Sequence, residues 1–470
     1  MPPRVSASGA PPLELAVELD RTSARPLAVQ LAEGLRGAAT RGQLRRGDRL
    51  PSTRALARHL DVSRTVTAAA YEQLHAEGWI AGRHGSGTYV TAAPPGVDGV
   101  AQAGTVVESD ADATRGVLLA PGAPWSQGID RAAWRRAWRA AGDKAPSTMP
   151  YRAGVPEYRA VIVEHLLRHR GLVVEGPAEN SVLATAGTTA ALAELAAAVL
   201  PSGATVAMEE PGYQRAVGAL RAGGIEVFPV PVDHSGLLVE RIPEHVDAVY
   251  CSPAHQYPLG GRMPAQRRTA LIERARTANW LIVEDDYDGE LRYDVAPLPV
   301  LAALAPDVVV HLGTTSKILT PTLGVGWLLA PEWVTTAVLE YRERTGTRPA
   351  PAGQWLLTEF AANGDLGRHL RRLRRELSGR RELVVDAFEG AGVELFGDRA
   401  GAHVVVPLSD GDTERRIMAS LRRRGVLVDG LRRHHQAEQQ WYGLALGYAV
   451  CGGRELRETL PILVSEIVGG

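Results

Sequence analysis

This 470-residue sequence contains very little lysine: only Lys144 and Lys317 occur, against fifty arginines. Both side chains serve about equally well on a solvated surface, but only lysine has an amine that can lose its proton and attack a carbonyl. Lys144, in AGDKAPS, has the context of a solvated helix end. Lys317, in GTTSKILTPTLGVGW, is therefore the candidate for chemistry.

Cysteine and long apolar runs are also scarce. The two cysteines, Cys251 and Cys451, lie in apolar contexts without C-x-x-C spacing, which excludes a disulfide scaffold and a zinc cluster. We accordingly predict no metal site. No stretch of about 18 residues is apolar without a charge, and the N-terminus lacks the apolar core of a signal peptide. These absences predict a soluble cytoplasmic protein with no membrane partner.

The net charge is only -1, but it is unevenly distributed. Residues 21–90 carry eleven arginines and five acidic residues, a net of +6, and the rest of the chain compensates. A protein coated in basic charge is thus excluded, whereas one basic domain joined to an acidic one is compatible with the count.

Composition divides the chain into successive regions. We predict an N-terminal tail over residues 1–23, an Arg-rich helical domain over 24–90, a flexible linker over 91–116 and a large domain over 117–470. In the large domain, Ala/Leu/Arg-rich helices alternate with short β-branched runs such as AVYCS, WLIVED and VVVHLG. This alternation predicts an α/β fold with βαβ units and a mostly parallel sheet.

Residues 49–90 have the pattern of a helix-turn-helix DNA-binding domain. Their sequence is RLPSTRALARHLDVSRTVTAAAYEQLHAEGWIAGRHGSGTYV. Ser52 can cap one short helix, and Asp61 or Ser63 can cap the next. The first turn of the second helix would expose four side chains, Ser63, Arg64, Thr65 and Thr67, as a recognition helix does. Two short strands follow, with Arg83 and His84 placed like a wing. The alternative is a small helical domain with a solvated basic face.

This segment resembles the GntR family of winged-helix regulators over almost the whole length of that domain. The resemblance rests on LPSTRALARHLDVSRTVTAAAYEQLHAEGWI followed by GRHGSGTYV. It implies that the following residues contact DNA or form the wing: Arg54, Ser63, Arg64, Thr65, Gly85 and Gly87. Double-stranded operator DNA is the implied partner.

The neighbours of Lys317 suit a Schiff-base lysine that holds pyridoxal 5'-phosphate (PLP). In WLIVEDDYDGELRY, Asp285 and Tyr287 follow the apolar strand Leu281 to Val283, at the edge where open α/β sheets place ligands. Asp285 would pair with the pyridine nitrogen, and Tyr287 would hydrogen-bond the phenolic oxygen. The alternative for this motif is a core strand with a solvated end.

A phosphate site is predicted from LATAGTTAALAELAAAVL, which reads as a strand, a turn and a helix. Gly187, Thr188 and Thr189 would offer N–H groups and hydroxyls at the helix N-terminus, where phosphate binds well. Thr314 could add a hydroxyl to the same phosphate. Tyr213, in MEEPGYQRA, could stack on the cofactor ring, and the loop YCSPAHQYPLGGRMP could close the pocket.

Together, APGAP, GTTAAL, EEPGY, SPAHQYPLG, VEDDYDGELRY and GTTSKILTP occur in the order of fold-type I aminotransferases. Behind a GntR-type domain, they resemble the MocR-type regulators over about residues 117–470. This resemblance implies a winged helix-turn-helix joined to an aminotransferase-like domain that binds PLP through Lys317 and makes the protein a homodimer. A small-molecule effector is implied as well.

Two positions depart from the pattern of that family. The family usually has an arginine that clamps the cofactor phosphate where this chain has Gly324, and an arginine that binds a substrate carboxylate where it has Ala445. Each loss removes a charge-assisted contact. Arg262 or the Arg432–Arg433 pair could compensate from other loops; the alternative for these arginines is solvated surface charge.

Three functions are compatible with the sequence. The first is a transcription regulator whose aminotransferase-like domain senses PLP or a PLP–amine adduct. The second is a working PLP-dependent aminotransferase with a DNA-binding domain, which the departure at Ala445 disfavours. The third is a regulator whose degenerate domain binds a metabolite other than PLP, and the loss of both arginines motivates it.

Overall fold

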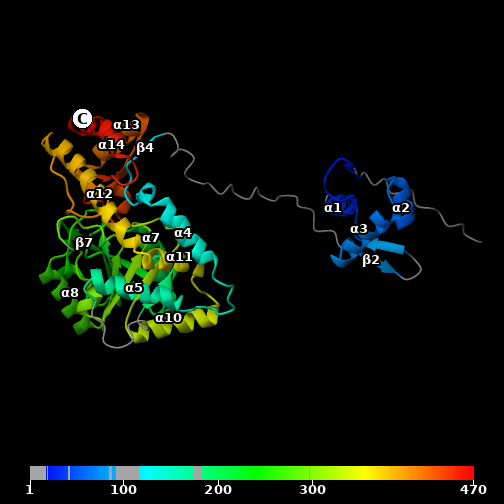
Figure 1. Ribbon diagram of the computed structural model, residues 1–470, viewed down its shortest axis with the longest axis horizontal. Helices are drawn as coiled ribbons and strands as arrows, with labels where there is room; N and C mark the ends of the chain where they lie inside the picture. The colour runs from blue at the N-terminus through cyan, green and yellow to red at the C-terminus, as the bar shows by residue number, and fades with distance from the viewer. Residues whose placement is uncertain are drawn as a thin grey trace, which may run out of the picture. The chain divides into compact units, whose positions relative to one another are not determined.

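The structure is a computed structural model that describes residue 17 and residues 19–40, 43–83, 87–91, 116–172, 182–295 and 297–469. The chain divides into two compact units, Met1–Ser109 and Asp110–Gly470 (Figure 1). The linker predicted over 91–116 lies outside the described residues except at Thr91 and Gly116. The predicted N-terminal tail is described only at residue 17 and from residue 19 onward.

The described part of the first unit consists of three helices and a three-stranded antiparallel sheet in the order β1-β3-β2. These elements are α1 (Leu27–Thr40), β1 (Arg49–Leu50), α2 (Thr53–His59), α3 (Arg64–Ala76), β2 (Ile80–Arg83) and β3 (Gly87–Val90). Their common core contains Leu31, Leu56, Leu74 and Ile80. A helix pair followed by a β-hairpin is the winged helix-turn-helix architecture that the sequence predicted.

Serine side chains begin both short helices of this unit. Ser52 Oγ accepts a hydrogen bond from Ala55 N at 3.2 Å and caps α2, and Ser63 Oγ accepts one from Val66 N at 3.4 Å and caps α3. Asp61, the other predicted cap, instead lies in the turn between the helices with φ 51°. The serine caps satisfy N–H groups that the helices themselves leave unpaired.

The second unit is built on an eight-stranded sheet in the order β5-β12-β11-β10-β9-β6-β7-β8. Its strands are β5 (Val182–Thr185), β6 (Thr205–Glu210), β7 (Glu226–Asp233), β8 (Gly236–Leu237), β9 (Ala248–Cys251), β10 (Leu281–Asp286), β11 (Val309–Thr314) and β12 (Gly326–Leu329). Pairing is parallel from β11 through β10, β9 and β6 to β7, and antiparallel at β12 and β8. The predicted α/β fold with a mostly parallel sheet is therefore confirmed.

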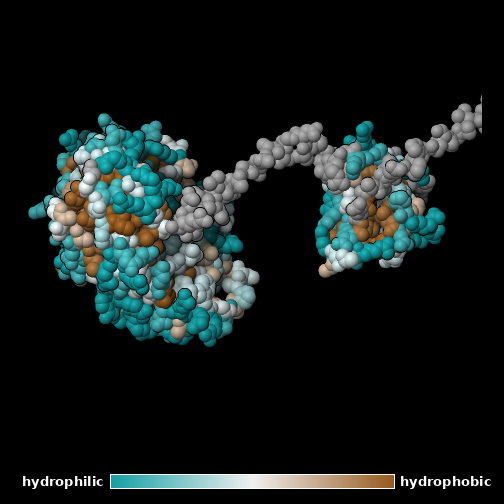
Figure 2. Space-filling view, turned by 90° about the horizontal axis from the view of Figure 1, so that it is seen from above, coloured by the Kyte–Doolittle hydropathy of each residue, from teal (hydrophilic) through white to brown (hydrophobic). Residues whose placement is uncertain are grey.

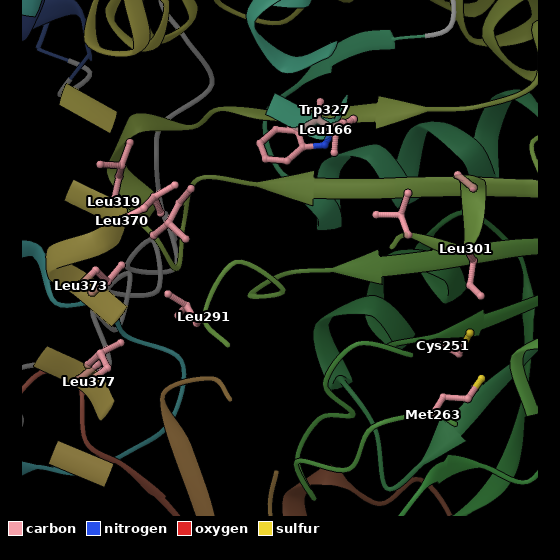
Figure 3. Close-up of a cluster of buried hydrophobic side chains, with 14 of the residues drawn as sticks. Leu166, Cys251, Met263, Leu291, Leu301, Leu319, Trp327, Leu370, Leu373 and Leu377 are labelled. Carbon is pink, nitrogen blue, oxygen red and sulfur yellow. The ribbon is translucent and has the colours of Figure 1, made fainter. Parts of the chain in front are cut away.

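Helices cover both faces of this sheet. One face carries α6 (Thr188–Ala198), α7 (Gln214–Ala222) and α10 (Glu332–Thr345), and the other carries α5 (Pro156–His169), α8 (Ala265–Ala278), α9 (Leu301–Leu304) and α11 (Pro351–Ala362). Alternate strand residues face opposite layers: Ile282 packs in one apolar cluster and Val283 in the other. Figure 3 shows part of the first cluster, where Leu166 and Trp327 lie together.

Smaller elements complete the second unit. They are β4 (Val117–Leu118), α4 (Arg131–Gly142), α12 (Asp365–Glu389), β13 (His403–Pro407), α13 (Gly411–Arg423), β14 (Val426–Leu427), β15 (Asp429–Gly430), β16 (Gly443–Gly447), α14 (Gly453–Val468) and four 3-10 turns, Ser126–Gly128, Val239–Arg241, Pro321–Leu323 and Leu431–His434. Strands β13, β16 and β15 form a separate antiparallel sheet. In Figure 2, hydrophilic side chains cover most of the visible face of each unit, with hydrophobic patches between them.

Candidate functional site

The predicted chemical residues of the second unit follow the ends of neighbouring strands. Asp285 lies near the end of β10, Thr314 ends β11, and Lys317 follows three residues later. Strand β5 leads through Gly187 into α6. These strands run in the same direction, so their carboxyl ends meet at one edge of the sheet, where α/β proteins place ligands.

Lys317 is held at this edge by the backbone of a distant segment. Its Nζ donates a hydrogen bond to the carbonyl oxygen of Gly122 at 2.5 Å. Burial lowers the pKa of the Lys317 amine, and the cation Arg215 adds to this effect, whereas Asp288 and Asp285 oppose it. Because the buried amine loses its proton more easily than an exposed one, Lys317 is suited to attack a carbonyl.

Asp285 is a buried carboxylate with one unsatisfied oxygen. Its Oδ2 accepts a hydrogen bond from the Tyr250 hydroxyl, while Oδ1 is buried and has no hydrogen-bond partner among the described residues. Burial raises the pKa of Asp285 to about 7, although Tyr250 and the Lys317 charge lower it. An orphaned buried oxygen of this kind leaves room for a donor supplied by a ligand.

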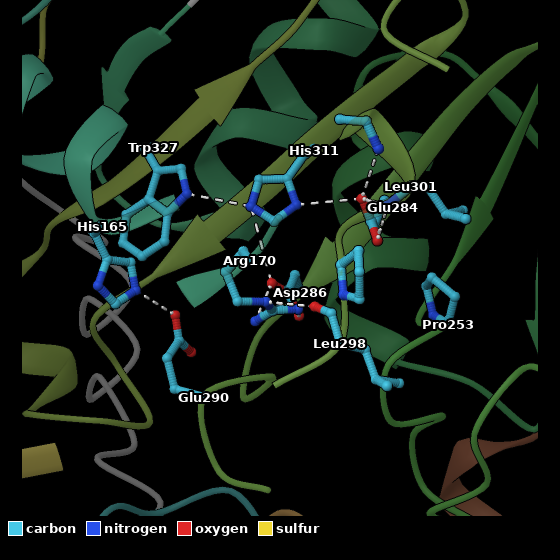
Figure 4. Close-up of polar contacts among 12 residues, drawn as sticks. His165, Arg170, Pro253, Glu284, Asp286, Glu290, Leu298, Leu301, His311 and Trp327 are labelled. Carbon is cyan, nitrogen blue, oxygen red and sulfur yellow. Dashed lines mark hydrogen bonds and ion pairs between the residues drawn. The ribbon is translucent and has the colours of Figure 1, made fainter. Parts of the chain in front are cut away.

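The acidic neighbours of Asp285 have structural partners instead (Figure 4). Asp286 pairs with the buried Arg170 at 2.7 Å, and Glu284 accepts hydrogen bonds from Leu301 N at 2.8 and 2.9 Å. His311 contacts Glu284 at 3.3 Å and accepts from Trp327 Nε1 at 3.3 Å. Because strand side chains alternate between faces, Asp285 points away from this network and towards the lysine side of the sheet.

Tyr287 belongs to a polar and aromatic group beside Asp285. Its hydroxyl lies 3.0 Å from His255 Nδ1, which is also 2.9 Å from Asp288 Oδ2. The ring of Tyr257 lies 6.0 Å from the rings of both Tyr287 and Tyr213. Tyr213 and Tyr287 therefore flank one aromatic cluster, and the predicted role of Tyr213 as a stacking ring remains a prediction.

The predicted phosphate cradle forms a continuous group. Gly187 adopts φ 124°, which favours glycine, and α6 begins at Thr188. A Cβ added at Gly187 would lie 3.7 Å from Thr314 Oγ1, and Thr189 Oγ1 lies 3.4 Å from the Tyr213 hydroxyl. The first turn of α6 thus offers N–H groups and hydroxyls next to Thr314, an arrangement suited to an anion.

Two of the arginines that the sequence suggested as substitutes have carboxylate partners within the chain. Arg262 lies 3.3 Å from Asp398, and Arg433 pairs with Asp429, so each already has a carboxylate partner. Ala445 is fully buried in an apolar cluster with Val405 and Leu431. Gly324 is exposed, in the left-handed region with φ 60°.

The individual roles of several contributors were not identified from the sequence, although Tyr250 and His255 lie in the loop that was expected to close the pocket. The Tyr250 hydroxyl hydrogen-bonds Asp285, and His255 hydrogen-bonds Tyr287. The Gly122 carbonyl accepts a hydrogen bond from Lys317. Tyr250 lies near the end of β9, next to β10 in the sheet, and this strand-end position was the signal that could have suggested it.

In the first unit, the predicted DNA contacts are partly gathered on one surface. Ser63, Arg64 and Thr65 are exposed at the start of α3, and Arg54 is exposed on α2. Arg83 ends β2 opposite Gly87, whereas His84 and Gly85 lie outside the described residues. The start of α3 therefore presents an arginine and two hydroxyl groups to solvent, as a DNA-recognition helix requires.

The predicted exposure of Thr67 is wrong. This residue is fully buried, and its hydroxyl donates to the carbonyl oxygens of Thr53 at 2.9 Å and Arg64 at 3.0 Å. Thr67 lies on the same face of α3 as Ala70, Tyr71 and Leu74, which turns inward against α2. Thr67 therefore joins the two helices and does not lie on the exposed surface at the start of α3.

Thr67→Val should loosen the helix pair, because valine keeps the shape but removes the hydroxyl that donates to the partly buried Thr53 carbonyl. The cost should be about 1–3 kcal/mol. Hydrogen–deuterium exchange of peptides from α2 and α3 should then accelerate roughly five- to 150-fold where exchange follows global opening of this unit. Ala69→Ser, at an exposed position of the same helix, is the control. Unchanged exchange in Thr67→Val would contradict this role.

Neither a metal centre nor a membrane-spanning helix is found in the described ranges. No group of three or more His, Cys, Asp or Glu side chains there could hold a metal ion. None of the helices in these ranges is both long and apolar enough to cross a bilayer.

Comparison with known proteins identifies both units. Residues 27–90 match the family described as "Bacterial regulatory proteins, gntR family", and residues 125–440 match "Aminotransferase class I and II". The chain is 34% identical over 457 residues to the HTH-type pyridoxine biosynthesis transcriptional regulator PdxR of Corynebacterium glutamicum, covering 97% of this chain and 98% of that protein. It is 30% identical over 477 residues to the probable rhizopine catabolism regulatory protein MocR of Rhizobium meliloti, covering 96% and 95%.

Solved structures show the same fold for the larger unit. An archaeal alanine:glyoxylate aminotransferase aligns with a TM-score of 0.70 and 24% identity over 75% of this chain and 91% of that one. LysN, the α-aminoadipate aminotransferase of Thermus thermophilus, aligns with a TM-score of 0.66 and 22% identity over 75% and 92%. The chain belongs to the gntR family of DNA-binding transcription regulators, in the MocR-type group that joins a winged helix-turn-helix to a fold-type I aminotransferase-like domain.

Proposed function

We propose that this regulator binds PLP through Lys317 and senses PLP, or PLP joined to an amine, to control its binding to operator DNA. One observation carries the proposal: the buried Asp285 keeps an unsatisfied oxygen close enough to Lys317 for their charges to interact. Burying a carboxylate without a full set of partners is costly, so this arrangement suits a ligand that donates a hydrogen bond at Asp285.

The residues present fit the groups of PLP. Asp285 Oδ1 would accept from the protonated ring nitrogen, and the Tyr287 hydroxyl would hold the ring oxygen. The start of α6, with Thr189 and Thr314, would bind the phosphate, and Tyr213 would contact the ring face. When bound, PLP supplies an aldehyde that reacts with amines and a ring that accepts electrons.

The chain's own groups prepare this chemistry. Burial favours the neutral, reactive form of the Lys317 amine, and the Gly122 carbonyl orients it. The Tyr250 hydroxyl fixes one oxygen of Asp285, so that the other faces the ligand. An amine bound together with PLP would contact these same residues differently, and this difference would give the regulator a signal distinct from PLP alone.

A relative of this chain also supports PLP as the ligand. The regulator PdxR of Corynebacterium glutamicum carries pyridoxine biosynthesis in its name and matches this chain over nearly its full length. A regulator of vitamin B6 production has a direct reason to sense PLP. We therefore propose PLP as the first ligand to test, and a homodimer that places two winged helices on paired half-sites.

A second candidate is a regulator that binds a metabolite other than PLP. It is favoured by Gly324 and Ala445, which stand where the resembled enzymes carry anion-binding arginines. Lost charge-assisted hydrogen bonds cost on the order of 1.5–3 kcal/mol each. Such a protein would give no PLP-dependent absorbance band. An active aminotransferase, by contrast, would convert amino acids over many turnovers.

PLP binding should weaken as the pH falls below 7. Burial raises the pKa of Asp285 to about 7, and only its ionised form pairs with a protonated ring nitrogen. Below the pKa the ionised fraction falls, from about one half at pH 7 to about one eleventh at pH 6, so the Kd should rise about fivefold over this range. Equilibrium titrations of the apoprotein with PLP at fixed ionic strength measure this. Asp285→Asn should bind weakly at every pH, and an equally steep profile in that variant would contradict the assignment.

DNA binding should depend on the exposed start of α3. We expect Arg64→Gln to weaken operator binding by about tenfold or more, because the guanidinium can pair with a base edge or a phosphate. The measurement is a fluorescence-anisotropy titration of an operator fragment at several salt concentrations. Arg344→Gln, at an exposed position of α10 in the other unit, is the matched control. Equal affinity of the two variants would contradict this interface.

A further inference from the structure

A second anionic site is suggested by a cavity of about 460 Å³ in the larger unit, away from Lys317. It lies between α12 and the segment that follows β10, and it is lined by Arg292, Tyr293, Arg374, Arg375, Ser378 and Glu382, among others. Its volume is in the range of small-metabolite sites, about 300–1,000 Å³.

Three arginines line the cavity, against one carboxylate, Glu382, which accepts a hydrogen bond from Ser378 Oγ at 3.4 Å. Arg292 is paired with Asp294 at 3.0 Å and Asp398 at 2.6 Å. Neither Arg374 nor Arg375 has a carboxylate partner in the described part of the chain. Arg374 only donates through Nε to the Glu290 carbonyl oxygen at 2.5 Å.

The surroundings of Arg374 increase this imbalance. Burial lowers the pKa of its guanidinium, and the cations Arg170 and Arg371 act in the same direction, while Glu290 opposes them. The Glu290 carboxylate is itself engaged by His165 at 3.0 Å. Arginines that repel one another in a partly buried site gain most from an anion that bridges them.

We propose that this cavity binds a small dianion, a phosphate monoester or a dicarboxylate, held by Arg374 and Arg375. A planar guanidinium binds two oxygens of such a group at once. A DNA backbone is the other polyanion available to a regulator, but a hollow between a helix and a loop suits a small ligand better than a duplex.

One segment of the chain connects the cavity with the candidate cofactor site. This segment, residues 285–293, carries Asp285 and Tyr287 at one end and lines the cavity with Arg292 and Tyr293 at the other. Arg374 holds the middle of this segment through the Glu290 carbonyl. The proposal itself is independent of PLP binding.

The experiment is isothermal titration calorimetry of the full chain with inorganic phosphate and, separately, with succinate, at constant ionic strength. We expect at least one probe to bind the wild type, and its identity indicates the ligand class. Arg374→Gln/Arg375→Gln, or Arg375→Gln alone if the pair unfolds, should weaken that binding at least tenfold. The matched control Arg454→Gln/Arg457→Gln removes two exposed charges from α14 and should stay within twofold of wild type.

A third variant separates the two anion sites. Thr189→Ala/Thr314→Ala alters the predicted cradle for the cofactor phosphate and should retain binding in the cavity. The proposal is overturned if neither probe binds, or if the cradle variant abolishes binding that the arginine variant keeps. It is also overturned if the arginine variant binds both probes normally and loses affinity only for operator DNA.

Discussion

Replacing Lys317 with alanine is expected to abolish covalent attachment of PLP. The wild type, incubated with PLP and dialysed, should retain a visible absorbance band, and Lys317→Ala should retain none. The reason is that Lys317 is a half-buried amine whose pKa is lowered by burial and whose charge interacts with that of Asp285. After reduction with borohydride, peptide mass spectrometry should find the added mass on the peptide that contains Lys317.

Because the chain has only one other lysine, a modified lysine can be assigned with little ambiguity. Lys144 is the other lysine of the chain; its side chain is 40% exposed, 3.2 Å from Glu359, and its Nζ lies over the Trp355 ring. Lys144→Ala should therefore keep the band. A modified peptide containing Lys144, or an α-amino group modified in place of Lys317, would contradict the assignment of the site.

Introducing an arginine at Gly324 is expected to strengthen PLP binding about ten- to a hundredfold. A guanidinium there would supply the phosphate contact that this chain lacks, at about 1.5–3 kcal/mol per charged hydrogen bond. Space is available, because a Cβ at Gly324 would meet no heavy atom within 4 Å. Gly324 also lies two residues before Gly326, where an added Cβ would be 2.8 Å from the Gly187 Cα at the cradle.

Gly324→Arg also introduces backbone strain, and the control variant must have the same strain. Gly324 has φ 60°, and a residue with a side chain loses about 1–2 kcal/mol in this left-handed conformation. Gly324→Ala has the same strain without the guanidinium, so the two variants isolate the contact. Equilibrium titration with PLP measures both. If Gly324→Arg binds PLP no more tightly than Gly324→Ala, the cradle does not hold the phosphate.

Local patterns were sufficient to predict the elements that carry the site. The runs AVYCS, WLIVED and VVVHLG correspond to β9, β10 and β11, because β-branched apolar residues favour buried parallel strands. Ser52 was predictable as a cap, and Ser63 as one of two candidates beside Asp61, because a cap depends only on the next three residues. The chemistry of Lys317 was suggested by its rarity, which no fold requirement explains.

Contacts between distant segments were not predictable in the same way. Gly122 is 195 residues from Lys317, and Tyr250 is 35 residues from Asp285. Such partners depend on the order of strands in the sheet, which local periodicity does not contain. The predicted exposure of Thr67 was wrong for a related reason. A polar residue near a helix start is expected to be exposed, and only the position of α2 supplies a carbonyl for its hydroxyl.

The central claim is that PLP acts on DNA binding through Lys317, and operator affinity with and without PLP tests it most directly. The operator would first be selected from genomic fragments with the wild-type protein. We predict that saturating PLP changes the Kd of the wild type by about five- to 150-fold, the usual range of coupling between sites, and leaves Lys317→Ala unchanged. An equal response of Lys317→Ala, or an unchanged Kd in wild-type protein that carries the absorbance band, would contradict the account.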